Sequence, residues 1–207
     1  MGVPFAHQSD PLDPTTLNDV FFRIGGTTVG KAATSLVVNS GNVLLDDIWA
    51  WRADHGTGVG WTVNTADTGL IVNGDNVTAY GLFVEHYQKY QVMWNGENGS
   101  TIMFQNEMPY DPPSQAARMH DGVNGFAAYK VADSVQTHQG WGLGSYCFFD
   151  LGIPIQAADA FEVPVTGGSP TPRRPDEVSK RKRRHRERGQ QHRRGCLRGE
   201  SGSERRG

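Results

Sequence analysis

Two segments of the chain are similar at an offset of 22 residues, and this internal repeat limits the possible folds more than any other feature. Residues 76–87 and 99–110 each carry a short apolar run that ends in a glutamate, Glu85 in the first and Glu107 in the second. A third unit, at residues 42–52, has a similar texture and is followed by a longer insertion. Self-similarity at a period of about 20 to 50 residues is typical of solenoids, and one coil of a β-helix has about this length.

Short apolar runs closed by Gly, Asn and Asp predict strands bounded by turns. No long window has the amphipathic period of a helix. The sequence therefore predicts an all-β fold, with residues 39–111 forming stacked coils of an incomplete right-handed parallel β-helix. An antiparallel β-sandwich, whose strands also recur between turns, remains the alternative. The predicted strands of this region are residues 43–51, 69–76, 77–84, 90–94 and 100–106.

The rest of the chain divides into three parts by composition. Residues 109–125, rich in Pro, Gly and Asp, are predicted to leave the coils as a loop, and residues 125–149 return to strand-like texture. We expect an irregular segment at 1–16, a partial β-helix domain at 17–165 and a tail at 166–207.

The tail differs sharply from the body in charge. Up to Pro170 there are six basic residues against 17 acidic ones, whereas the remainder holds 14 basic and five acidic residues and no aromatic one. Such a segment cannot build a core, so we expect disorder. A basic tail can bind nucleic acid, but without interleaved aromatic residues we do not expect a nucleic-acid partner. A shift of reading frame in GC-rich coding sequence is the explanation we favour.

Glu85 and Glu107 are the candidate catalytic residues. Because neighbouring strands lie about 4.8 Å apart, one coil of 22 residues brings the two carboxylates together. Like charges at that separation raise the pKa of one group, which can then hold a proton at neutral pH. A protonated carboxyl is the general acid that cleavage of a glycosidic bond needs. The alternative is a pair of solvated surface acids. Glu97 lies in a predicted turn and is assigned no role.

Aromatic and polar side chains near these acids are candidates for binding a substrate. Ring faces suit the apolar faces of sugars, and of the ten aromatic residues in the region Trp94 and Tyr110, beside turns, are the best candidates. His55 and His86 are possible hydrogen-bond donors to a substrate, and Asp54 belongs to the same predicted set. None of these residues has a metal-ligand spacing, and no cofactor fingerprint is present, so no metal or cofactor is predicted.

Four motifs together resemble glycoside hydrolase family 55, the exo-acting β-1,3-glucanases built from two tandem β-helix domains. Some relatives are labelled coagulation factor 5/8 type domain proteins. The resemblance covers roughly residues 17–165, and its motifs are long enough to be specific. The motifs are Trp49–Trp61, Asn73–Tyr90, Trp94–Gly99 and Phe104–Pro113.

The resemblance implies cleavage of β-1,3-glucan with inversion and without a metal. By motif, the general acid falls on Glu107, and the second glutamate, which supports the water or the sugar, falls on Glu85. It also implies an extracellular protein, although the first residues do not have the pattern of a signal peptide. We expect a polysaccharide partner, a monomer, and no membrane association.

Family members are several times longer, and their cleft lies between two β-helices. We therefore expect this chain to be a fragment with weak or no activity by itself. Two other functions remain open, namely a non-catalytic glycan-binding or structural β-helix and a polysaccharide lyase on the same fold. A lyase would need calcium and a basic catalytic residue, for which Arg52 near Asp54 is the one candidate.

Overall fold

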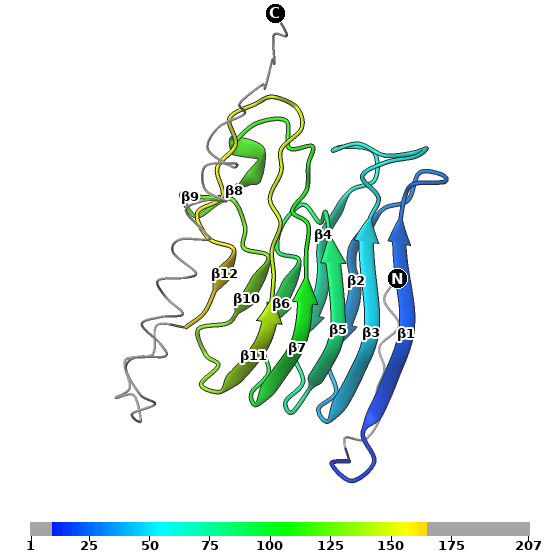
Figure 1. Cartoon of the computed structure of the whole chain (residues 1–207), viewed down its shortest axis with the longest axis vertical. Helices are drawn as coiled ribbons and strands as arrows, with labels where there is room; N and C mark the ends of the chain where they lie inside the picture. Colours follow the sequence, from blue (N-terminus) through cyan, green and yellow to red (C-terminus); the bar gives the residue numbers. More distant parts are fainter. Residues whose placement is uncertain (1–9, 165–207) are drawn as a thin grey trace, which may run out of the picture.

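The computed structural model describes residues 10–164, which form a two-sheet solenoid (Figure 1). Within residues 10–164 there are twelve strands and one short 3-10 helix, η1, at Ala116–Arg118. Strands of the two main sheets alternate along most of the chain, so successive strands lie on opposite sides of the core. The strands are β1 Thr15–Ile24, β2 Ala32–Val38, β3 Val43–Arg52, β4 Ala66–Val72, β5 Thr78–Glu85, β6 Val92–Trp94, β7 Gly99–Gln105, β8 Met119–His120, β9 Val123–Asn124, β10 Tyr129–Val131, β11 His138–Leu143 and β12 Phe161–Glu162.

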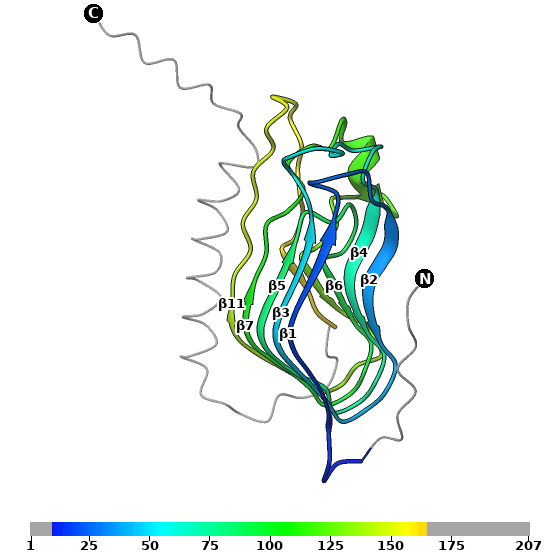
Figure 2. The ribbon, with the colours of Figure 1, turned by 90° about the vertical axis from the view of Figure 1, so that its right-hand side faces the viewer.

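All pairing within the two main sheets is parallel. The first sheet has the order β1-β3-β5-β7-β11, and the second has the order β12-β10-β6-β4-β2. Figure 2 shows the two sheets facing each other, with tight turns joining them at the lower end and longer loops at the upper end. The parallel β-helix prediction is confirmed, and the antiparallel sandwich is excluded for residues 10–164, whose one antiparallel strand pair is the β8–β9 hairpin.

The predicted register of the repeat is also confirmed. Leu82 of β5 pairs with Phe104 of β7, and Phe83 pairs with Gln105, both at an offset of 22 residues. The longer insertion after β3 is real as well, because Ile48 pairs with Leu82 and the chain between them includes the loop that follows Arg52.

Asparagine stacks hold the lower turns together from coil to coil. Asn73 Nδ2 donates a 2.7 Å hydrogen bond to Asn39 Oδ1, and Asn95 Nδ2 donates one of 2.7 Å to Asn73 Oδ1. Three residues further along each turn, Asn42, Asn76 and Asn98 adopt positive φ, a conformation that asparagine tolerates better than most residues. The sequence pattern Asn-x-x-Asn thus marks the passages from β2 to β3, from β4 to β5 and from β6 to β7.

The core lies between the two sheets and consists mainly of aliphatic side chains. Leu45, Ile48, Leu82 and Val84 of the first sheet are at most 1% exposed, as is Leu70 of the second. At about 25 cal/mol per Å² of apolar area, this burial is the main stabilising contribution to a fold in which each coil contacts only its neighbours.

The loop excursion at 109–125 contains more local structure than predicted, namely η1 and the β8–β9 hairpin. No helix among residues 10–164 is long and apolar enough to cross a membrane. The predicted tail at 166–207 and most of the predicted irregular segment at 1–16 lie outside the described residues.

Candidate functional site

A row of residues with positive φ decides which side chains of the first sheet face outward. Each strand of this sheet contains one such residue, which its pairing register skips. One extra residue exchanges the two faces of a strand, so the side chains alternate as if Gly81 were absent. Tyr80 and Phe83 therefore both face outward, while Leu82 and Val84 are buried. If Gly81 had ordinary extended geometry, strict alternation from Tyr80 would turn Glu85 toward the core. The row consists of Asp19, Asp47, Gly81, Met103 and Gly142.

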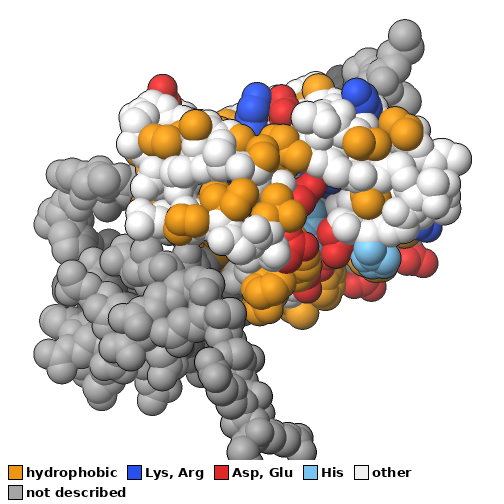
Figure 3. Space-filling model, turned by 90° about the horizontal axis from the view of Figure 1, so that it is seen from above, with side chains coloured by type: hydrophobic (Ala, Val, Ile, Leu, Met, Phe, Trp, Pro, Cys, Tyr) orange, Lys and Arg blue, Asp and Glu red, His pale blue; other side chains and the backbone are white. Residues whose placement is uncertain are grey.

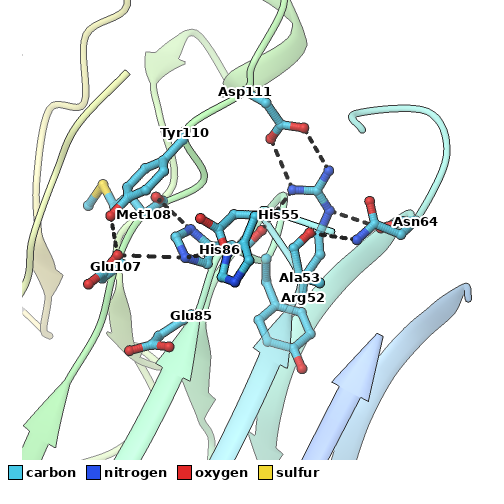
Figure 4. Close-up of polar contacts among 12 residues, drawn as sticks. Arg52, Ala53, His55, Asn64, Glu85, His86, Glu107, Met108, Tyr110 and Asp111 are labelled. Atoms are coloured by element: carbon cyan, nitrogen blue, oxygen red, sulfur yellow. Dashed lines mark hydrogen bonds and ion pairs between the residues drawn. The ribbon is translucent and has the colours of Figure 1, made fainter. Parts of the chain in front are cut away.

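Glu85 and Glu107 lie side by side at the upper end of the first sheet (Figure 4). Trp51 of β3 pairs with Glu85, and Glu107 forms a parallel bridge with Tyr146, so one row crosses four neighbouring chain segments. The backbone N–H of His86 donates a 2.8 Å hydrogen bond to the carbonyl oxygen of Glu107, which fixes the two segments at this level. The predicted proximity of the two glutamates is confirmed, and their catalytic roles stay predictions.

Glu85 sits in a partly desolvated position that favours its protonated form. Burial raises the pKa of its carboxyl above the usual range, and the negative charges of Glu107 and Asp54 raise it further. The indole N–H of Trp49 opposes this effect by donating a 2.9 Å hydrogen bond to Glu85 Oε2.

Glu107 is partly exposed and is held by a tyrosine. Its side chain is 32% exposed, and the hydroxyl of Tyr110 donates a hydrogen bond to its Oε2. The ring of Tyr110 packs edge-on against Phe148, with ring centroids 5.5 Å apart. Burial and the contact with Glu107 both raise the pKa of Tyr110, so its hydroxyl is a neutral donor. Tyr110 therefore lies in the predicted site.

His86 lies behind the two acids rather than in front of them. It is only 2% exposed, so the prediction that it donates directly to a substrate is wrong. Its Nδ1 lies 3.3 Å from the carbonyl oxygen of Met108, which can only accept a hydrogen bond, and Nδ1 therefore carries the proton. Its Nε2 lies 3.6 Å from Glu107 Oε2 and 3.7 Å from Asp54 Oδ1. Burial is the largest effect on this ring and lowers its pKa, which favours a neutral imidazole.

His55 and Asp54 form the accessible side of the same cluster. The His55 side chain is 77% exposed, and its Nδ1 lies 2.8 Å from Asp54 Oδ1. The ring of His55 also packs on Trp51, at 5.1 Å between ring centroids. Both residues are therefore within the group that the sequence predicted.

Trp94 does not belong to the site. It is the last residue of β6 in the second sheet, is 0% exposed, and stacks on Tyr129 with ring centroids 6.1 Å apart. A ring without accessible surface cannot contact a substrate, so this part of the prediction is corrected. Val92 and Trp94 alternate with the half-buried Met93, and that period of two is a signal in the sequence that Trp94 faces inward.

Sequence reasoning missed a buried ion pair beneath the site. Arg52, which is 1% exposed, donates two hydrogen bonds of 3.0 Å each to the carboxylate oxygens of Asp111. Its Nε donates a 2.9 Å hydrogen bond to the carbonyl oxygen of Asn64. Because Arg52 is buried and fully engaged, it cannot serve as the base of a lyase, and that possibility is wrong. The partners are 59 residues apart, and no local pattern pairs them.

An aromatic surface next to Glu85 is a second feature that the sequence pattern does not indicate. Phe21 and Trp49 stack with ring centroids 4.5 Å apart, and Trp51 lies 6.0 Å from Trp49. Phe21 and Trp49 are 47% and 43% exposed. Figure 3 views this end of the molecule, where acidic side chains and histidines lie beside hydrophobic ones. Exposed ring faces next to paired carboxylates provide what a site acting on a sugar needs, a platform for the ring and groups that transfer protons.

Comparison with known proteins gives consistent matches. The model of the LAM55 pectate lyase-like domain matches residues 1–107. An exo-beta-1,3-glucanase from Streptomyces sp. (strain SirexAA-E / ActE) is 58% identical over 168 residues, which is 81% of this chain and 28% of that protein.

Two solved structures match as well. The structure of sacteLam55A from Streptomyces sp. SirexAA-E superimposes with a TM-score of 0.76 at 55% identity, covering 79% of this chain and 30% of that one. A glutamate-to-alanine variant of sacteLam55A in complex with glucose gives a TM-score of 0.74 at the same identity and coverage. The chain thus spans less than a third of the length of these relatives.

Proposed function

The chain belongs to the LAM55 pectate lyase-like domain family, and from this premise we propose that it supplies the acid-bearing wall of a site that hydrolyses β-1,3-glucan. The observation that carries the proposal is the pair Glu85 and Glu107, in register on neighbouring strands and facing outward beside exposed aromatic rings. The glucanase from Streptomyces, which is 58% identical, supports the substrate class.

Glu107 is the proposed general acid. Its carboxyl is partly exposed, so it can reach the oxygen that links two sugar units and protonate it as the bond breaks. Tyr110 orients this carboxyl through its hydrogen bond to Oε2. The neutral His86 behind it presents the unprotonated Nε2 to Glu107 and Asp54.

Glu85 is the proposed partner that activates or positions the attacking water. A general base works best when its pKa lies near the working pH, and burial raises the pKa of Glu85 in that direction. We assign the acid to Glu107 and the base to Glu85 by relation to the family, because burial by itself favours the proton on Glu85. Inversion requires room for a water between the second carboxylate and the sugar, and this part of the proposal rests on the family.

Trp49 and His55 are the proposed contacts for the sugar, with the buried Trp51 supporting both rings. Trp49 and Trp51 lie 6.0 Å apart and border Glu85, and His55 is exposed beside them. By relation to the family, we also propose that the protein acts outside the cell on wall or storage glucan.

The test is a chimera of the Streptomyces glucanase in which the matching 168-residue segment is replaced by the segment of this chain. We expect the chimera to release glucose from a soluble β-1,3-glucan, and Glu107→Gln to reduce the rate by at least about 10³-fold, within the range that acid catalysis contributes. Leu151→Ala, on an exposed residue outside the site, is the matched control. Hydrolysis by the Glu107→Gln chimera at the control rate would falsify the proposal.

A non-catalytic glycan-binding role is the second candidate, supported by the aromatic surface alone. Under that function the chimera binds glucan but releases no glucose, and Glu107→Gln changes neither property. The 207-residue chain alone should be a poor catalyst, because its described residues supply one wall of the site. Rates from the isolated chain equal to those of the chimera would contradict this expectation.

A further inference from the structure

A groove runs across the outward face of the first sheet, near the opposite end of the strands from the two glutamates. Its volume is about 610 Å³. It spans the first halves of β5, β7 and β11 together with the turns that precede β7 and β11. The residues that line it are Thr78, Tyr80, Asn98, Gly99, Ser100, Ile102, Thr137, Gln139 and Trp141.

Two exposed aromatic rings frame this groove at a spacing set by the sheet. Tyr80 pairs with Ile102, and Ile102 pairs with Trp141, so the two aromatic residues stand on alternate strands with an aliphatic side chain between them. Strands lie about 4.8 Å apart, which places Tyr80 and Trp141 about 10 Å from each other. They are 45% and 47% exposed, so ring surface is available to a ligand.

The polar groups of the groove are all neutral. Hydroxyls from Thr78 and Ser100 form a 3.0 Å hydrogen bond with each other and keep free lone pairs toward the groove. Amide and hydroxyl groups of Asn98, Thr137 and Gln139 complete the lining, which contains no charged residue. A charged polymer such as a nucleic acid would find no counter-charge here.

The geometry points to a second glycan-binding site in this groove, one that holds a neutral β-linked glucan chain. Sugar rings offer apolar faces that stack on aromatic rings and hydroxyls that bond to neutral donors and acceptors. Two rings about 10 Å apart on the sheet suit two units of an extended chain that have one further unit between them, over Ile102. A site for a protein partner would instead be expected to carry a larger buried apolar centre.

This groove is separate from the glutamate site. Tyr80 precedes Glu85 by five residues on the same strand, a distance of up to about 16 Å at the rise of a β-strand. Binding here needs no proton transfer, so the inference goes beyond the proposed hydrolysis and can hold or fail independently of it.

The test measures how the 207-residue chain is retarded in native gels that contain a soluble β-1,3-glucan, with a soluble α-glucan as the comparison polymer. All proteins carry Glu107→Gln, so that no substrate is consumed. We expect Trp141→Ala or Tyr80→Ala to weaken binding by about tenfold, equivalent to about 1.4 kcal/mol. Leu151→Ala, an equally exposed residue outside the groove, should not change retardation.

Circular dichroism and thermal unfolding establish that each variant is folded. Unchanged retardation of the two groove variants would overturn the inference, as would an absence of retardation in the parent chain. A dimer in the parent chain that Trp141→Ala abolishes, seen by sedimentation, would assign the groove to a second copy and would also overturn it.

Discussion

The indole N–H of Trp49 donates a 2.9 Å hydrogen bond to Glu85 across two neighbouring strands. Trp49 stands two positions before Trp51, the residue that pairs with Glu85, so the contact runs diagonally over the sheet. The bond stabilises the ionised carboxylate, whereas burial favours the protonated one. Trp49 therefore both offers a ring to a ligand and limits the rise in the pKa of Glu85.

Replacing Trp49 by Phe should raise the pKa of Glu85 further, because the hydrogen bond that lowers it is lost. In the chimera, the acidic limb of the pH–rate profile should move to higher pH, since the proposed base must be ionised. An NMR titration of carboxyl carbons in the isolated chain measures the pKa directly. A fall in the pKa, or no change, would contradict the assigned effect of this bond.

Asp111→Asn should destabilise the protein by about 3 kcal/mol, because it leaves the buried Arg52 without a charged partner. Denaturant unfolding with a linear extrapolation gives the change in free energy of unfolding. The control is Asp67→Asn, which breaks an ion pair with Lys89. In that pair the side chain of Lys89 is 51% exposed and that of Asp67 is 47% exposed. That exposed pair should contribute less than about 1 kcal/mol, and equal losses at the two positions would show that burial of Arg52 has no special role.

Gly96→Ala should destabilise the coil stack, because a Cβ at this position would overlap with the carbonyl oxygen of Gly74 in the turn below. A backbone atom cannot rotate away, so the coils must separate, at a cost of about 1–3 kcal/mol. At Gly144 the nearest atom would lie 3.8 Å from the new Cβ, and Gly144→Ala should be tolerated. Thermal unfolding of both variants compares them, and a similar melting temperature for the two would count against close stacking of the turns.

His138 should make the fold sensitive to acid. Burial lowers the pKa of its imidazole to about 4, whereas the unfolded chain titrates near 6.5. Between these values the unfolded state binds the additional proton, so this residue's contribution to stability is complete above about pH 6.5 and is lost as the pH falls toward about 4.

His138→Gln should therefore reduce the difference in free energy of unfolding between pH 7 and pH 4.5. The comparison with the parent chain is necessary because Glu85, whose pKa is raised, changes stability with pH in the opposite direction. A variant as sensitive to acid as the parent would exclude His138 as the source.

The solenoid is predictable from the sequence where its coils are short. β5 and β7 are joined by compact turns, so their offset is visible directly, and the repeat by itself places Glu85 beside Glu107. The coil from β3 to β5 is longer because of the loop after Arg52, and its register is correspondingly less visible. The Asn-x-x-Asn pattern at residues 39–42, 73–76 and 95–98 is also present in the sequence and aligns these three turns.

Other parts of the site had no local signal. Arg52 and Asp111 belong to separate motifs, and only the stacking of coils brings them together. Asp47 and Met103 adopt positive φ although neither is glycine, so their residue types do not indicate the phase change in their strands. For Trp94 two signals in the sequence disagree. Its position beside a turn favours an exposed ring, whereas its alternation with Val92 predicts a buried one, and the ring is buried.

The row of positive-φ residues in the first sheet has a consequence for how this protein can evolve. Because Met103 is the extra residue of its strand, the residues after it alternate as if it were absent, and deleting one extended residue between Met103 and Glu107 should turn everything after the deletion over and move Glu107 toward the core. Substitutions along these strands can be absorbed one side chain at a time, whereas a single-codon deletion reverses the polarity of a whole half-strand. We therefore expect homologous domains to differ freely in residue type and in loop length, and to keep the same number of residues in the strands of the first sheet that carry this row.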